Sequence, residues 1–259
     1  MLRFFRTIRK KLMEHPSKGR TRNKVRTYLL YAIGEILLVV IGILIALQIN
    51  NWNENKVERK QELKILEQIN ADLEENNNNI EFIVEALTGI DQSIDSVLTS
   101  LEQKKVISYF SVYVSMIHRK VFFNNSISGY SLLSNSFGTI IQNDSLRNSI
   151  VLLYESDFTN ILERQKIMFD IHEQHLYPQS HRLFTINQNV QINAPWLDDV
   201  SYNPYIPINF DELTENIEYI NTIKNLKKVL YLRLTYLERT QERIKNVKAT
   251  LNSEVNKFN

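Results

Sequence analysis

The sequence predicts an all-α protein, with one N-terminal transmembrane helix followed by an elongated antiparallel helical bundle with coiled-coil-like packing. The first observation is an uninterrupted apolar run at residues 28–49. The second is a spacing of seven residues between apolar positions in two later stretches. The third is that only three of the six glycines follow residue 50 and that cysteine is absent, which argues against a turn-rich sheet and a disulfide framework. We therefore expect a basic cytoplasmic segment (1–27), a transmembrane helix (28–49) and an extracytoplasmic bundle (50–259).

The apolar run has the length and composition of a membrane anchor. Residues 28–49 contain a single charge, Glu35, and a helix of roughly 20 apolar residues spans the hydrocarbon core of a bilayer. The run is longer than the apolar part of a cleaved signal peptide, which has about 7–15 residues, and no small-residue cleavage site follows it. Trp52 and Tyr28 fit the aromatic positions at the two membrane interfaces. These features indicate a single-pass signal anchor that is not cleaved.

The two flanks of this run carry opposite charge. Residues 1–27 have ten Lys or Arg against one acid, a net charge of +9, whereas residues 50–259 have 21 basic and 27 acidic residues, a net charge of −6. Short flanks rich in Lys and Arg stay in the cytoplasm. We therefore expect the N-terminus inside and the bulk of the chain outside. Nucleic-acid binding is disfavoured because the basic cluster lies beside the membrane and the remaining chain is acidic.

The stretch after the anchor has the pattern of one long packed helix. Two lines of residues, each with a step of seven, are offset by three, which is the a/d seam of a long helix. Asn76 is the one polar member, and it is followed by three more asparagines. Either Asn76 is buried and fixes the register, or this is a solvated and weakened turn; the run of four asparagines favours the turn. The first line is Leu66, Leu73, Ile80, Leu87, Ile94 and Leu101, and the second is Ile69, Asn76, Ile83, Ile90 and Val97.

The C-terminal stretch repeats this pattern with a narrower stripe. Its second line includes Leu234 and Val255, but it also includes Lys227, Gln241 and Lys248. Such a stripe fits a helix that contacts one or two neighbours. We expect this helix to pack antiparallel to the first one. Its first line is Ile223, Leu230, Leu237, Ile244, Leu251 and Phe258.

The middle of the chain is less regular. Residues 104–123 are rich in β-branched and aromatic residues, yet with helices expected on both sides we predict a short helix or irregular packing. Asn143 is positioned to cap a helix over 146–177, and Pro178 marks its expected end.

Residues 185–212 form the longest irregular stretch. Three prolines alternate there with aromatic residues that include Trp196, Tyr202 and Tyr205. A loop of this length is usually functional or disordered, and the aromatic residues argue against disorder. It is either a cap folded over the end of the bundle or a partner-binding surface; we favour the cap.

Four residues of the apolar run are candidates for helix contact. Gly34, Gly42 and Ala46 lie on one helical face, and the pair Gly42 and Ala46 has the small-xxx-small spacing that allows close helix approach. Glu35 lies next to this face. An ionisable residue in a membrane helix is a functional candidate by default. The alternative is an acid that is tolerated near the cytoplasmic interface.

No motif indicates catalysis, a metal or a cofactor. His172 and His175 share a helical face and have Glu173 between them and His181 beyond. A zinc site needs a third ligand at defined geometry, so solvated helix residues are the preferred interpretation. The sequence has no Gly-x-Ser-x-Gly, His-Glu-x-x-His or phosphate-binding glycine loop. We therefore expect no cofactor and no enzyme.

Two stretches resemble a known family. Residues 31–54, YAIGEILLVVIGILIALQINNWNE, look like the hallmark of an uncharacterised single-pass inner-membrane family of Gram-negative bacteria, filed as a domain of unknown function. Residues 129–147, followed by Leu153 and Tyr154, are similar to its central signature. The chain departs from the family's Ser-Ser-Gly-like turn at Asn135-Ser-Phe-Gly138. The resemblance implies an inner-membrane protein with most of its chain in the periplasm. It implies no particular activity, because the family has none assigned.

Three classes of function remain. The first is a membrane-anchored scaffold that binds a protein partner or a second copy of itself, through the transmembrane and long helices. The second is a ligand-sensing bundle coupled to a partner in the membrane, and the third is a hydrolase with an unrecognised site. Sensing predicts a buried polar cavity, whereas a scaffold predicts a filled core and an exposed apolar or aromatic patch.

Overall fold

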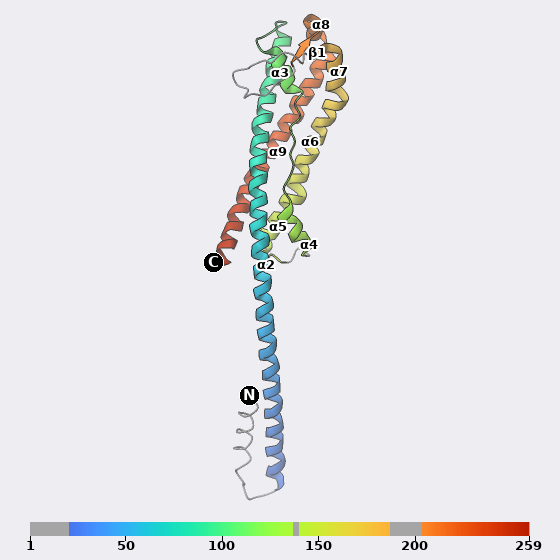
Figure 1. Cartoon of the computed structure of the whole chain (residues 1–259). Helices are drawn as coiled ribbons and strands as arrows, with labels where there is room; N and C mark the ends of the chain where they lie inside the picture. The colour runs from blue at the N-terminus through green and yellow to red at the C-terminus, as the bar shows by residue number, and fades with distance from the viewer. Residues whose placement is uncertain (1–20, 137–139, 187–203, 259) are drawn as a thin grey trace. The chain divides into compact units, whose positions relative to one another are not determined.

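The protein is almost entirely helical over the residues that the structure describes. The computed structural model describes residues 21–136, 140–186 and 204–258, with side chains from Leu29 onward. Figure 1 shows long helices joined by short ones, and a single pair of short strands lies within the described ranges. The all-α prediction is confirmed, with this small sheet as an addition to it.

The elements follow one another in a simple order. The α-helices are α2 (Thr21–Glu102), α3 (Phe110–Ile117), α4 (Ser128–Asn135), α5 (Asp144–Leu152), α6 (Thr159–Ile171), α7 (Tyr177–Leu183), α8 (Phe210–Glu215) and α9 (Ile217–Val255). The π-helical turns are η1 (Leu153–Phe158) and η2 (His172–Leu176), and a 3₁₀ turn, η3 (Asn256–Phe258), follows α9. The strands β1 (Phe184–Ile186) and β2 (Tyr205–Pro207) pair antiparallel, with Thr185 opposite Ile206.

The chain divides into two compact units, Met1–Glu58 and Arg59–Asn259. In the first unit the described residues all belong to α2, so the expected helix at 28–49 is part of a longer one. From Leu29 to Glu58 the side chains are exposed, apart from the half-buried Gly34. The apolar run is long and apolar enough to cross a membrane, although no membrane is present here.

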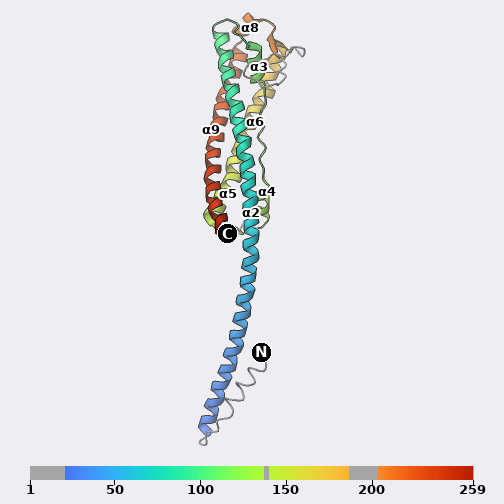
Figure 2. The same cartoon turned by 60° about the vertical axis from the view of Figure 1, so that its left-hand side comes forward.

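The second unit is a bundle of three rods. The first rod is α2 from Arg59 onward, the second is the run from α5 to α7, and the third is α9 (Figures 1 and 2). Lys248 pairs with Glu74 near one end, and Lys227 pairs with Asp91 and Asp95 near the other, so α9 runs antiparallel to α2. With 39 residues, α9 is roughly 58 Å long.

The predicted seam of α2 forms the centre of the core. All eleven residues of its two lines are at most 2% exposed. Asn76 is fully buried, so the solvated interpretation of this position was wrong. Its Nδ2 donates to the Ser126 carbonyl at 2.9 Å and its Oδ1 accepts the Ser126 N–H at 2.6 Å. The amide is tolerated in the core because both of its polar atoms bond to backbone.

The buried stripe of α9 differs from the predicted one. Its first line is buried as expected, except for the half-buried Phe258. The second line lies three residues after the first rather than four, so Leu234 and Val255 are half-buried and not central. The second line that is buried in the structure contains polar residues, so a search for apolar residues at a spacing of seven does not find it. It comprises Leu226, Arg233, Thr240, Val247 and Glu254, with Tyr219 one step earlier.

The middle rod continues past its expected end. Asn143 caps α5 as predicted, since its Oδ1 accepts the Leu146 N–H at 3.1 Å. Pro178 does not end the helix, which runs to Leu183. A proline is tolerated in the first turn of a helix, where its missing N–H is not needed. The π-helical turn η2 ends immediately before α7 and gives Pro178 such a position.

Residues 104–127 contain the predicted short helix, α3, followed by extended backbone. The extended residues 118–127 have no ladder of hydrogen bonds, and side chains from each rod bond to them instead. The Phe123 N–H donates to Gln165 Oε1 at 2.6 Å, and Arg233 Nη2 donates to the Val121 carbonyl at 2.8 Å. With Asn76 on α2, at least one polar side chain from each rod holds this segment in place.

The start of α4 is capped by a carboxylate from another helix. Asp72 on α2 accepts the Gly129 N–H through Oδ2 and the Ser128 hydroxyl through Oδ1, both at 2.6 Å. An acid at a helix N-terminus also favours the helix dipole. Glycine allows this contact, because a Cβ at Gly129 would come within 2.5 Å of the Ile69 backbone nitrogen.

The contact between Gly129 and α2 leads to a paired prediction. We expect Gly129→Ala to lower the free energy of unfolding by at least about 2 kcal/mol, because backbone on both sides must shift. Gly89→Ala is the matched control. Its new Cβ meets Met116 Cε at 3.6 Å, an ordinary contact, and alanine inside a helix is favoured by up to about 1 kcal/mol. Urea unfolding of the detergent-solubilised full chain, followed by circular dichroism, measures both; equal effects would contradict the contact.

Candidate functional site

The four candidates in the apolar run lie on an open helix surface. Glu35, Gly42 and Ala46 are exposed and Gly34 is half-buried. A Cβ built on either glycine meets nothing within 4 Å. No described atom of the chain fills the space beside these two glycines, so this face has room for the close approach of another helix.

The partner-surface candidates divide into two groups. Trp196 and Tyr202 lie outside the described residues. Tyr205 is the first residue of β2 and is half-buried. Its ring stacks on the His118 ring, with centroids 4.0 Å apart and planes 14° apart, and it also contacts Phe184. Tyr205 is therefore packed onto the bundle, whereas Ile208 of the same segment is 62% exposed.

His118 is the centre of a buried polar cluster that the sequence did not reveal. Its Nδ1 lies 2.7 Å from the Val114 carbonyl oxygen and its Nε2 lies 2.5 Å from Ser180 Oγ. The Ser180 hydroxyl also lies 2.7 Å from the Leu176 carbonyl oxygen. Burial lowers the pKa of His118 to about 4, because a desolvated imidazolium is unfavourable.

The contact between Ser180 and His118 has the connectivity of a nucleophile with its base. However, Ser180 is 3% exposed and His118 is 6% exposed. In this conformation a substrate does not reach the hydroxyl. We therefore assign the pair a role in holding α3, α7 and β2 together.

The histidines considered as metal ligands lie in different environments. His172 is fully buried, with Nδ1 2.8 Å from the Met168 carbonyl oxygen and Nε2 3.0 Å from the Ile117 carbonyl oxygen. His175 is exposed. Burial lowers the pKa of His172 below its usual value. Among the described residues, no group of three or more His, Asp or Glu side chains is arranged to hold a metal ion.

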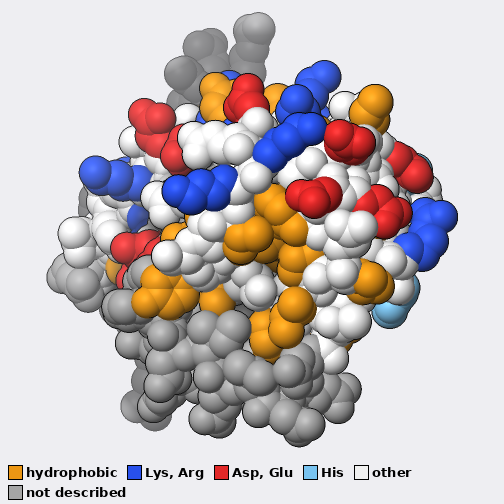
Figure 3. Space-filling view, turned by 90° about the horizontal axis from the view of Figure 1, so that it is seen from above, with side chains coloured by type: hydrophobic (Ala, Val, Ile, Leu, Met, Phe, Trp, Pro, Cys, Tyr) orange, Lys and Arg blue, Asp and Glu red, His pale blue; other side chains and the backbone are white. Residues whose placement is uncertain are grey.

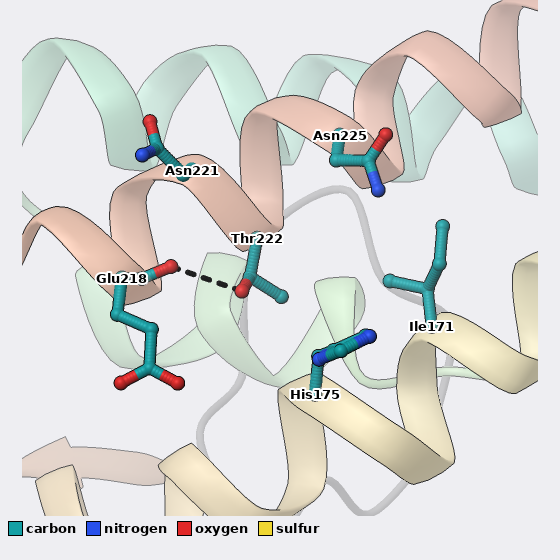
Figure 4. A pocket seen from close by; sticks show the side chains of 6 residues that line it. All are labelled: Ile171, His175, Glu218, Asn221, Thr222 and Asn225. Atoms are coloured by element: carbon teal, nitrogen blue, oxygen red, sulfur yellow. Dashed lines mark hydrogen bonds between the residues drawn. The ribbon is translucent and has the colours of Figure 1, made fainter.

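An open polar groove lies between η2 and the first turns of α9 (Figure 4). It has a volume of about 350 Å³. The Thr222 hydroxyl donates to the Glu218 backbone carbonyl at 2.9 Å. The side-chain amide of the buried Gln179 donates to the Glu218 carboxylate and to the Thr222 hydroxyl oxygen. Figure 4 shows that the Glu218 carboxylate and the His175 ring do not point toward each other. The lining residues are Ile171, His175, Glu218, Asn221, Thr222 and Asn225.

Apolar side chains gather at the end of the bundle where α2 turns into α3. Figure 3, which looks onto this end, shows them between basic and acidic side chains. Val106, Ile208 and Ile217 are 56%, 62% and 72% exposed, and we call these three residues the apolar end surface. The loop that carries Val106 has left-handed backbone at Lys104 and Tyr109, with φ of 51° and 61°. Such backbone is uncommon for residues other than glycine.

Arg233 is a buried cation whose hydrogen-bond acceptors are all neutral. It is fully buried on α9, and desolvation lowers the pKa of its guanidinium to about 10. Nη2 donates to the Val121 carbonyl at 2.8 Å and to Gln165 Oε1 at 2.9 Å, and Nη1 lies 3.5 Å from Met168 Sδ. These bonds join α9, α6 and the extended segment. Nothing in the sequence spacing marks this residue, since its acceptors lie more than 60 positions away.

Replacement of Arg233 by lysine tests this junction. An ammonium group lacks the planar fork that reaches two acceptors, and it is more strongly hydrated than guanidinium. We expect Arg233→Lys to lower the free energy of unfolding by about 3 kcal/mol, the cost of a buried charge that loses its partners. Arg239→Lys, at an exposed position on the same helix, is the control and should change little. Thermal and urea unfolding check both; similar stability of the two variants would contradict the proposed junction.

Comparison with known proteins gives one match. Residues 35–186, from the apolar run to the end of β1, match a family of unknown function (DUF6090). The match covers more than half of the chain, and it agrees with the expected membership of an uncharacterised domain family. No curated protein and no solved structure matches the chain. The chain therefore belongs to DUF6090, a family of unknown function.

Proposed function

We propose that this protein is a single-pass membrane protein whose helical bundle acts as an interaction scaffold outside the cytoplasm. The observation that carries the proposal is that the apolar run is exposed from Leu29 to Ile49 apart from the half-buried Gly34. Exposed aliphatic side chains in such number are unfavourable in water and favourable in lipid. A bilayer therefore supplies the burial that the chain does not.

The charge on the two sides of the anchor supports its direction. The +9 segment at 1–27 is retained in the cytoplasm by the positive-inside rule, and the −6 segment at 50–259 is exported. In a Gram-negative cell this corresponds to an inner-membrane protein with a periplasmic bundle. Trp52, which is 65% exposed and lies near Lys56, fits the outer interface.

A filled core supports a scaffold over a ligand sensor. The seam residues of α2 and most of the facing stripe of α9 are buried, and the polar groove beside His175 is open to solvent rather than enclosed. Val106, Ile208 and Ile217 of the apolar end surface are exposed apolar side chains that a partner of the scaffold would bury. Sensing is the second candidate, because the groove is within the size range of small-molecule sites. Hydrolysis comes last, since Ser180 and His118 are buried.

Extraction of membranes tests the anchor. We expect the wild-type chain to stay in the pellet after alkaline extraction, and the variant with Leu38→Arg and Ile41→Arg to move to the supernatant. Each arginine costs about 2.5–3.5 kcal/mol at the centre of a membrane helix. Phe82→Arg on the bundle surface, where Phe82 is 57% exposed, is the matched control and should stay in the pellet. If the double variant behaves like the wild type, the apolar run is not the anchor.

Cross-linking tests whether the small-residue face forms a contact. The chain has no cysteine, so each introduced thiol is unique. We expect Ala46→Cys, on the same face as Gly34 and Gly42, to form a covalent adduct in native membranes. Leu44→Cys, on the opposite helical face, is the control and should form little adduct. An adduct of twice the chain mass identifies self-association, and another mass identifies a partner protein; equal reaction at both positions contradicts a specific contact.

A further inference from the structure

The pair of strands β1 and β2 is fastened to the bundle by a buried histidine that no proposed function uses. We propose that the β2 side of this hairpin is an acid-sensitive strap, which is held on α3 while His118 is neutral and is released when His118 becomes protonated. The strap consists of the described residues 204–208. This inference is independent of the membrane anchor and of any partner.

Two contacts hold β2 on α3. The Tyr205 ring stacks on the His118 ring at 4.0 Å, and the Tyr205 N–H donates to Ser115 Oγ at 3.3 Å. By contrast, β1 follows α7 without a break, and the buried Phe184 ring packs against Tyr219 at 5.4 Å. β2 is also joined to β1 by the antiparallel ladder and by the Ile208 N–H, which donates to the Leu183 carbonyl at 2.9 Å, so release of the strap breaks these bonds together with the two contacts on α3.

The groups that face His118 offer no negative charge to a proton on its ring. On α3 it meets a carbonyl, on α7 a hydroxyl and the Tyr177 ring at 6.0 Å, and on β2 the Tyr205 ring. The charged groups that act on it are His172 and His181, and both lower its pKa. Lys120 and Glu173 pair with each other and act on His172 instead. Among the described residues that face His118 there is no carboxylate.

The direction of the pH dependence follows from these surroundings. Burial lowers the pKa of His118 from 6.5 to about 4 while the strap is closed, and an imidazole in water regains the higher value. The closed strap is therefore fully favoured above pH 6.5 and loses stability as the pH falls toward 4. By this linkage, the equilibrium constant for opening rises at most about 20-fold between pH 7 and pH 5, the limit being reached if the open strap exposes His118 to water completely.

Hydrogen exchange of the full chain in detergent measures this opening. After correction for the intrinsic rate at each pH, the amides of Tyr205, Ile206 and Ile208 are expected to exchange several-fold faster at pH 5 than at pH 7, with about 20-fold as the upper limit. Amides of the α2 core should not change, which separates opening of the strap from global unfolding. His118→Phe keeps a ring for the stack and cannot titrate, so its strap should exchange independently of pH.

Two further variants complete the test. His175→Asn removes an exposed histidine near the same end and should keep the wild-type pH response. Tyr205→Leu removes the stack without altering His118, and its strap should exchange rapidly already at pH 7. If the wild-type strap shows no acceleration at pH 5, or if His118→Phe shows the same acceleration, His118 does not control the strap.

Discussion

The bundle depends on how it accommodates one extended segment, residues 118–127, among three helical rods. Backbone N–H and C=O groups that leave water need partners, and this segment has no strand beside it to provide them. The rods provide them instead, through Asn76 on α2, Gln165 on α6 and Arg233 on α9. Because each rod contributes at least one polar side chain, the segment also fixes the rods relative to one another along their length.

This arrangement explains why a cation lies inside the bundle. A guanidinium reaches two acceptors at once, and Arg233 joins the Val121 carbonyl to the Gln165 amide, whose oxygen also accepts the Phe123 N–H. Its lowered pKa reflects the cost of burial without a counter-charge. The two Nη2 bonds of Arg233 favour one arrangement of the rods over alternatives, although its Nε is buried without a hydrogen-bond partner. An apolar residue in place of Arg233 would leave the two acceptors to find other donors.

The long helices could be predicted because their buried positions repeat every seven residues with apolar side chains. The same rule failed where the core is polar. It misplaced the second stripe of α9, which contains Arg233, Thr240 and Glu254, and it assigned Asn76 to solvent. Pro178 was expected to end a helix, and a π-helical turn, which has no simple sequence pattern, gave it a tolerated position. The cluster around His118 joins residues more than 60 positions apart, and spacing within one helix carries no information on such contacts.

The use of polar side chains in the interior also constrains where this chain can bind anything. The side chains best suited to hold a ligand, among them Arg233, Asn76, Asp72 and His118, already bond to the chain's own backbone or to neighbouring side chains. Among the described residues, the proposed scaffold function therefore depends on positions that stability does not require. Val106, Ile208 and Ile217 are such positions, since each is more than half exposed at the end of the bundle. The β2 strap lies among the same segments, so a change in its attachment alters the surface that this end presents.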